Sequence, residues 1–249
     1  MCGRYTVTAS ATELEARFDA TFEDEFRPRY NAAPGQALPV ITNERPGAIQ
    51  HLEWGLVPRW ADDDSGGLIN ARVETVTEKP SFAAAYESRR CLVPADGFYE
   101  WKPVESGKRP YRVTVGEGEP FAMAGLWERW TPTEKQTALD EFGGGGPDRS
   151  VEPLETFTVL TTEPNDLVAD LHHRMAVILP EGREREWLTA ETRRRRVSRT
   201  RLSGVENGTA EDPGHLLEPY PADRMRAYPV SRAVNDPAND SSTLIEPVA

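Results

Sequence analysis

The sequence is poor in cysteine and histidine for its length of 249 residues. Its two cysteines, Cys2 and Cys91, form no CxxC motif and do not suggest a disulfide scaffold. None of the four histidines has zinc-ligand spacing. His172 and His173 are adjacent, and on a helix their side chains would point about 100° apart, which is poor for joint ligation. We therefore expect neither a metal nor another cofactor.

Long apolar runs are also missing. No segment approaches the length of a membrane span, and the first residues lack the basic and apolar stretches of a signal peptide. The sequence predicts a cytoplasmic protein without membrane association, and we expect a monomer.

Positive charge is scarce as well. The net charge is −12, and lysine occurs only at positions 79, 102, 108 and 135. This composition favours a protein from a high-salt cytoplasm, with an ordinary acidic cytosolic protein as the alternative. An acidic surface argues against general nucleic-acid binding, so any DNA site would have to be a local cluster of arginines.

The chain begins Met1-Cys2, and removal of the initiator Met would leave Cys2 with a free α-amine and a thiol. The amine titrates near about 8 and the thiol near about 8.5, so both have a reactive fraction at neutral pH. Together they can react twice with one aldehyde, because the amine gives an imine and the thiol then closes a thiazolidine ring. The alternative is a cysteine placed by chance in a frayed terminus.

Local patterns predict an α+β fold in a single domain, 1–249, with one mainly antiparallel sheet system and no βαβ alternation. Ser10 to Glu13 read as a capping box before a helix over 11–19. Further helices are expected at 80–86, 164–172 and 181–188. Strands are expected at 37–42, 49–54, 68–74, 91–102 with a turn inside, 157–161, 175–179 and in the tail 228–235.

Four local features complete this prediction. Residues 27–35 are expected to form an ordered loop, because they are rich in Pro, Arg and Asn. Residues 111–115 and 121–127 are expected to pair as a hairpin, and 134–150 to form a flexible insertion. Alternate residues of a strand share a face, so Asn70, Arg72 and Glu74 should lie together.

Five motifs in order resemble the SOS-response-associated-peptidase (SRAP) family over nearly the whole chain. They are Met1-Cys-Gly-Arg-Tyr5, Trp54-Gly-Leu-Val-Pro58, Asn70-Ala-Arg-Val-Glu74, Cys91-Leu-Val-Pro-Ala-Asp-Gly-Phe-Tyr-Glu-Trp101 and Leu171-His-His-Arg-Met175, followed by the tail Val230-Ser…Val234-Asn235. The resemblance implies a barrel-like antiparallel β core with peripheral helices. Family members include abasic-site-processing proteins that form DNA–protein crosslinks.

The resemblance also implies roles for single residues. Cys2 would capture the ring-opened sugar aldehyde of an abasic site in single-stranded DNA, with the protein nucleoid-associated once crosslinked. Asn70 would orient the sugar or nucleophile, Glu100 would be the acid/base carboxylate, and His172 would assist ring opening. The implied DNA contacts are Arg4, Asn31, Trp60, Arg72 and Arg174. Ala176 replaces the usual proline after the histidine motif, which affects the rigidity of that turn.

Each of these residues also has an ordinary structural interpretation. Glu100 could be a surface residue of an edge strand, His172 a helix C-cap and Asn70 a turn residue. Cys91 is expected to be a core residue. Trp54, Trp101 and Trp127 are expected in the core, with Trp60 exposed, and the basic run 193–196 is expected to be a solvated face.

Two other functions remain open on the sequence. Cys2, His172 and Glu100 could form the nucleophile, base and orienting group of a cysteine-type (auto)peptidase. Alternatively, the protein could read modified DNA bases without covalent chemistry, which would require a base pocket but not Cys2.

Overall fold

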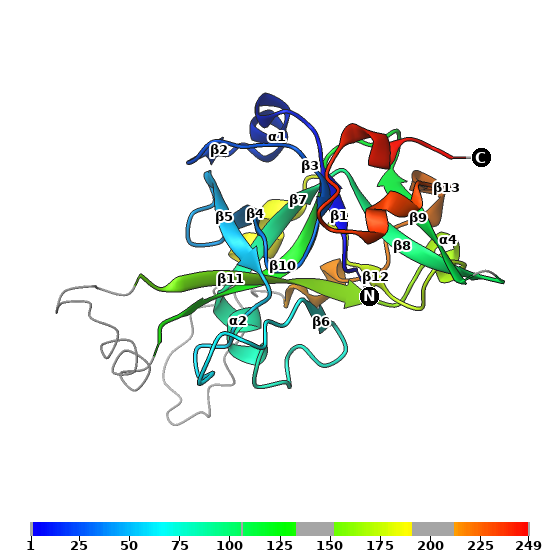
Figure 1. The fold of residues 1–249 in the computed structure, drawn as a ribbon. Helices are drawn as coiled ribbons and strands as arrows, with labels where there is room; N and C mark the ends of the chain where they lie inside the picture. The colour runs from blue at the N-terminus through cyan, green and yellow to red at the C-terminus, as the bar shows by residue number, and fades with distance from the viewer. Residues whose placement is uncertain (1, 106, 133–151, 191–211, 249) are drawn as a thin grey trace, which may run out of the picture.

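Five strands close on themselves to form a mixed β-barrel (Figure 1). In the computed structural model, which describes residues 2–105, 107–132, 152–190 and 212–248, the barrel consists of β4 (Ala37–Thr42), β5 (Ala48–Trp54), β7 (Arg90–Ala95), β10 (Phe121–Trp130) and β11 (Leu154–Thr162). Neighbours β5-β4-β7-β10-β11 pair antiparallel, and a parallel pairing of β11 with β5 closes the circuit.

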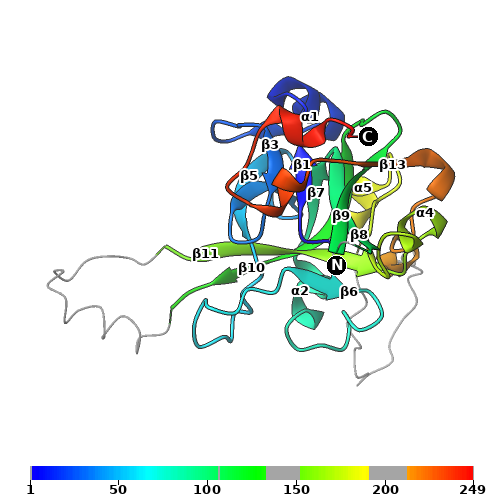
Figure 2. The ribbon, with the colours of Figure 1, turned by 45° about the vertical axis from the view of Figure 1, so that its right-hand side comes forward.

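A second, five-stranded sheet packs beside the barrel and includes the first strand of the chain (Figure 2). Its order is β13 (Met225–Pro229), β9 (Gly107–Val115), β8 (Gly97–Val104), β1 (Tyr5–Val7) and β3 (Arg29–Ala32). Three short strands extend the barrel sheet: β2 (Thr21–Phe22) pairs with β5, while β6 (Asn70–Arg72) and β12 (Met175–Ala176) pair with β11.

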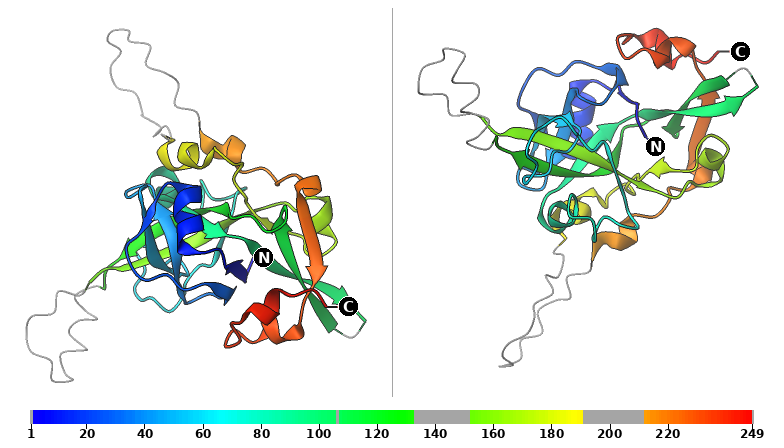
Figure 3. Two further views of the ribbon diagram at one scale, coloured as in Figure 1. Left: turned by 90° about the horizontal axis from the view of Figure 1, so that it is seen from above. Right: turned by 60° about the horizontal axis from the view of Figure 1, so that its bottom comes forward.

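Short helices lie around these sheets (Figure 3). They are α1 (Ala11–Phe18), α2 (Ala83–Ser88), α4 (Asp166–Ala169) and α5 (Glu184–Thr189), with 3-10 turns at Pro213–Leu216, Ala222–Arg224, Arg232–Asn235 and Ser242–Ile245. The capping box is confirmed, since the Ser10 side chain accepts from the Glu13 N–H and the Glu13 carboxylate accepts from the Ser10 N–H. The α+β class and the barrel-like, mainly antiparallel core are confirmed as well.

The predicted hairpin of 111–115 with 121–127 is wrong. β9 pairs with β8 and β13, whereas β10 pairs with β7 and β11, so the two strands belong to different sheets. The turn between them was a correct signal for a chain reversal, but a turn does not determine which strand becomes the partner. Long-range packing decides that, and β9 instead forms its hairpin with β8.

The predicted loop at 27–35 contains a strand. β3 pairs with β1, with Tyr5 opposite Ala32 and Val7 opposite Arg29. The composition of residues 27–35 indicated a loop, but pairing with β1 satisfies the backbone hydrogen bonds of this segment as a strand.

Several other elements are shorter than expected. β6 ends at Arg72, so Glu74 lies beyond the strand, and α4 ends at Ala169, so His172 lies beyond the helix. β12 covers only Met175–Ala176 of the predicted strand 175–179. The insertion 134–150 and the basic run 193–196 lie outside the described residues.

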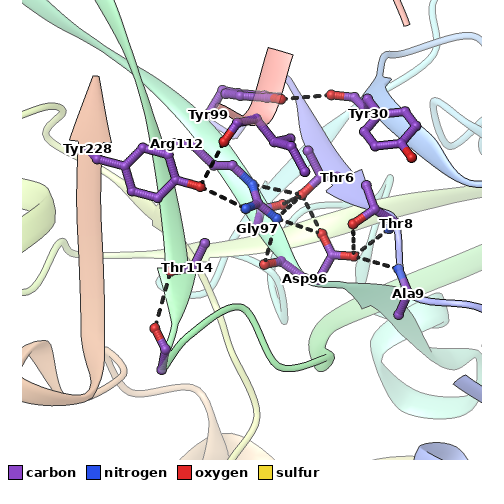
Figure 4. Close-up of polar contacts among 12 residues, drawn as sticks. Thr6, Thr8, Ala9, Tyr30, Asp96, Gly97, Tyr99, Arg112, Thr114 and Tyr228 are labelled. Carbon is purple, nitrogen blue, oxygen red and sulfur yellow. Dashed lines mark hydrogen bonds and ion pairs between the residues drawn. The ribbon is translucent and has the colours of Figure 1, made fainter. Parts of the chain in front are cut away.

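A buried ion pair between Asp96, the residue that joins β7 to β8, and Arg112 ties β1, β9 and β13 together (Figure 4). Arg112 of β9 lies 2.9 Å from a carboxylate oxygen of Asp96, and both side chains are buried. Asp96 also accepts hydrogen bonds from the Thr6 hydroxyl at 2.6 Å and from the Thr8 hydroxyl at 2.9 Å. Arg112 in turn donates to the Tyr228 hydroxyl of β13 at 2.8 Å. The pair therefore positions β1, and with it Cys2, against β8.

Glycine is required next to this pair. A Cβ added at Gly97 would lie 2.7 Å from the Arg112 side chain and 2.9 Å from the Thr6 hydroxyl oxygen. The Asp-Gly dipeptide of the 91–101 motif is therefore explained by a close approach of Arg112 to the backbone.

Replacing Asp96 by Asn should destabilise the fold strongly. The change leaves the buried Arg112 without its counter-charge. It also places an amide N–H₂ group, which can only donate, against groups that themselves donate hydrogen bonds. The expected cost is about 3–5 kcal/mol. The matched control is Glu117→Gln, which breaks the exposed ion pair of Glu117 with Arg226 and should cost less than about 1 kcal/mol. Urea unfolding measures both; similar costs for the two variants would contradict the organising role of Asp96.

Candidate active site

Cys2 is fully buried beside the second sheet, at the N-terminal end of β1. Tyr5 pairs with Phe98 of β8, and the Tyr99 N–H donates to the Arg4 carbonyl. Continuing this antiparallel register places Gly3 opposite Glu100. The chain start lies beside β6 and β8 in two views (Figures 1 and 2). The alternative of a frayed terminus is therefore wrong for Cys2.

Asn70 binds the backbone of Cys2 directly. Its side-chain nitrogen donates to the Cys2 carbonyl oxygen at 2.8 Å. Its side-chain oxygen is buried and accepts no hydrogen bond among the described residues. β6 holds Asn70 in place because it pairs with β11, with Asn70 opposite Val159. A buried acceptor left open is costly, which indicates a group reserved for a ligand or for the chemistry.

Burial determines the protonation of the reactive groups. It raises the pKa of the Cys2 thiol to about 12, and the nearby charge of Glu100 adds to this rise. Burial likewise raises the pKa of Glu100 to about 8. At neutral pH both groups are therefore predominantly protonated, and Glu100 has a pKa suited to giving and taking protons near pH 7–8.

His172 lies in the segment between α4 and β12. Its Nδ1 faces the Arg174 backbone, 3.1 Å from the nitrogen and 3.2 Å from the oxygen. Burial lowers the pKa of His172, so the ring is mostly neutral at pH 7. The ring of His173 is 4.2 Å away between centroids, and His173 is exposed.

Glu100 and His172 line one cavity of about 580 Å³. The rest of its lining comes from Trp101, Lys108, Arg232 and Asn235.

Trp101 donates from its indole nitrogen to the Asn235 side-chain oxygen at 2.8 Å. The expectation that Trp101 is a core residue is only partly right. Trp101 packs on a small second apolar cluster, apart from the main core, and it also lines the cavity. The buried members of this cluster are Tyr99, Val230, Val234 and Leu244. Trp54 and Trp127 are core residues, as predicted.

Sequence reasoning missed Lys108, Arg232 and Asn235 as cavity residues. Asn235 was part of the motif in the tail, which was a usable signal. Lys108 and Arg232 carried no local signal, because only the packing of β9 and of the C-terminal segment brings them to the cavity.

Two of the predicted DNA contacts are engaged inside the protein. Asn31 is fully buried, and its side-chain nitrogen lies within 2.8–3.2 Å of the carbonyl oxygens of Val234, Asp236 and Asn239. Arg4 donates to the Asn31 side chain at 3.0 Å and to the Val234 carbonyl at 2.8 Å. In this structure both residues hold the C-terminal segment against the site; their contact with DNA stays a prediction.

The other three predicted contacts differ in exposure. Arg174 is buried and donates from its two terminal guanidinium nitrogens to the two carboxylate oxygens of Glu74, at 2.5 and 2.9 Å. Arg72 is exposed on β6, and Trp60 has 62% of its surface exposed in the loop between β5 and β6. Arg72 and Trp60 are therefore presented to solvent, whereas Arg174 braces the segment that carries His172.

No cluster of three or more potential metal-ligating His, Cys, Asp or Glu side chains occurs in the part of the chain that the structure describes. Within the same residues, no helix is long and apolar enough to span a membrane.

The fold and the site define a protein with a buried cysteine near the start of the chain, bound by Asn70, and a neighbouring cavity lined by Glu100 and His172. Residues 1–237 match the family model described as SOS response associated peptidase (SRAP). The abasic site processing protein YoqW of Bacillus subtilis is 39% identical, over 99% of each chain, and YedK of Escherichia coli, of the same description, is 28% identical over the full length of both. A crystal structure of a protein from Bacteroides thetaiotaomicron has the same fold, with a TM-score of 0.76 and 24% identity over all of both chains.

The chain belongs to the SRAP family. The resemblance stated from its motifs is thereby confirmed. The roles of the individual site residues remain predictions.

Replacing Glu100 by Gln should stabilise the protein, and more so at alkaline pH. The folded state raises the pKa of this carboxyl to about 8, so between the ordinary pKa of Glu, about 4.3, and pH 8 the folded protein holds the extra proton. Stability contributed by Glu100 is therefore lost as pH rises through this window. Gln has no proton to lose, so the gain in melting temperature over the parent should grow from about pH 5 to pH 8 and then level off. A gain independent of pH would contradict the raised pKa.

Proposed function

We propose that this protein senses abasic sites in single-stranded DNA and binds them covalently through Cys2 after removal of Met1, which shields the lesion. The relatives described as abasic site processing proteins support the substrate. The observation that carries the chemistry is the contact of Asn70 with the Cys2 carbonyl, because it holds the nucleophilic residue rigidly beside Glu100.

The reaction is an addition and condensation without oxidation or reduction. The α-amine of Cys2 attacks the aldehyde carbon of the open sugar, and a carbinolamine forms. Loss of water gives an imine. The Cys2 sulfur then bonds to the same carbon while its proton passes to the nitrogen, which completes the thiazolidine ring.

Glu100 moves the protons of this sequence. As a carboxylic acid it protonates the leaving hydroxyl of the carbinolamine, and as a carboxylate it accepts the proton of the attacking amine. Its raised pKa lets it do both near neutral pH. The open oxygen of Asn70 accepts a hydrogen bond from the α-amine and directs its lone pair.

His172, which lines the same cavity as Glu100, assists the opening of the sugar ring. An abasic sugar reacts only as the open aldehyde, and opening requires a proton at the ring oxygen. An imidazole exchanges protons readily near neutral pH. The Arg174 backbone at Nδ1 fixes the orientation of the ring.

Exposed groups on β6 and in the loop before it bind the DNA. Arg72 offers a guanidinium fork for a phosphate, and Trp60 offers a stacking surface for a base. Arg4, Asn31 and Arg174 act on the DNA through the segments that they hold.

The cysteine-peptidase alternative is less well supported. A peptidase needs a thiolate, and burial raises the pKa of the Cys2 thiol to about 12. An amine-first reaction tolerates a neutral thiol, since the thiol acts only after the imine has formed. A non-covalent reader of modified bases would have no use for the ordered Cys2.

Covalent capture gives a direct test. Purified protein mixed with an abasic single-stranded oligonucleotide should give a heat-resistant shifted band on a denaturing gel, and intact DNA should give none. Cys2→Ala should abolish the band, as should an uncleaved N-terminal extension, because it converts the amine to an amide. Normal crosslinking by protein whose intact mass confirms the extension would contradict the thiazolidine.

The pH dependence of the crosslinking rate tests Glu100. The rate should rise as the amine loses its proton and fall above about pH 8, where Glu100 loses the proton that it donates. Glu100→Gln should lower the rate by about 10²–10⁴-fold and remove the alkaline fall. Binding of the oligonucleotide should be nearly unchanged.

Histidine variants supply the matched control. His172→Ala should slow crosslinking, and its exposed neighbour His173→Ala should not. Equal losses in both variants would indicate damage to the loop instead of a role for His172 in ring opening.

A further inference from the structure

Two cationic side chains flank the cavity that holds Glu100 and His172. Lys108 comes from β9 and Arg232 from the 3-10 turn Arg232–Asn235, so they reach the cavity from different elements. Burial and then the charged N-terminus have the largest effects on the pKa of Glu100 and of His172, and the charge of Lys108 makes a smaller contribution that lowers both. Lys108 therefore acts electrostatically on both of the groups that line the cavity.

The segment that carries Arg232 is held rigidly. Arg4 and Asn31 bind the Val234 carbonyl from one side. Further along, the Asp240 carboxylate pairs with Arg29 at 2.6 Å and accepts from the Tyr30 and Asn31 N–H groups. The C-terminal segment lies along β1 and β3 in Figures 1 and 2. Arg232 and Asn235 are thus pre-positioned at the cavity rim before any ligand binds.

We propose that Lys108 and Arg232 form a subsite for a backbone phosphate adjacent to the abasic sugar. This inference rests on the proposed function, because a sugar in the cavity carries a phosphodiester on each side. With a net charge of −12, the protein cannot attract DNA by its overall field, so local cations must supply the attraction. Arg4 and Arg174 donate hydrogen bonds to internal partners, whereas Lys108 is exposed at the rim.

The test uses a labelled single-stranded oligonucleotide with a tetrahydrofuran abasic analogue, which has no aldehyde and cannot crosslink. Fluorescence anisotropy gives Kd over a series of potassium chloride concentrations. For single strands, each phosphate contact adds about 0.7 to the slope of log Kd against log salt. Lys108→Gln and Arg232→Gln should each weaken binding and lower this slope, by at most about 0.7 because both side chains contact the same phosphate, with melting temperatures unchanged.

Two further variants sharpen the comparison. Arg185→Gln removes one positive charge on α5, a helix that packs on β7, and should leave the slope as in the parent. Arg232→Lys retains the charge and should keep the parent slope even if the turn repacks. A change in slope with Arg185→Gln equal to that with Lys108→Gln would show a general charge effect and overturn the subsite.

A neutral methylphosphonate placed at either phosphate flanking the analogue identifies the contact. At one of the two positions it should weaken binding of the parent and abolish the additional effect of Lys108→Gln. Unchanged slopes in both Gln variants, with normal binding by the parent, would overturn this inference alone. Absence of any binding by the parent would overturn the proposed function with it.

Discussion

The buried pair of Asp96 and Arg112 is the interaction on which the arrangement of the site depends. A buried carboxylate is stable only when its charge is matched and its oxygens accept hydrogen bonds. Asp96 meets both conditions through Arg112, the Thr6 hydroxyl and the backbone N–H groups of Thr8 and Ala9. These hydrogen-bond partners belong to the first strand and its continuation. The ion pair therefore keeps β1 aligned on β8 and holds the buried Cys2, which would otherwise fray, in the site.

Burial shifts the pKa values of the groups in the site, and the same burial lowers the stability of the folded protein. Glu100 and Cys2 are enclosed strongly enough that both favour their protonated forms at neutral pH. A buried carboxyl with a raised pKa lowers the stability of the folded state above its ordinary pKa, and the same shift gives Glu100 the pKa near 8 that its proposed role requires. The open acceptor of Asn70 is a second cost of this kind.

The C-terminal segment completes the cavity from the other end of the chain. Asn31 and Arg4 bind its carbonyl groups, and Asn235 fixes the indole of Trp101. Residues that resemble DNA contacts in the sequence thus form part of the frame around the cavity. Two cationic side chains, Lys108 and Arg232, line the same cavity in this strongly acidic chain.

The sequence by itself determined the α+β class, the capping box before α1, most of the strands and the family. These features follow from local periodicity, from hydrogen bonds between close neighbours and from motifs that can be read in order. It also identified Cys2, Asn70, Glu100 and His172 as candidates. Only the tertiary structure decided that β9 and β10 enter different sheets, that Asn31 and Arg174 are braces, and that Lys108, Arg232 and Asn235 line the cavity. Strand partners and buried polar contacts join residues far apart in the chain, so their energies depend on packing that no local pattern records.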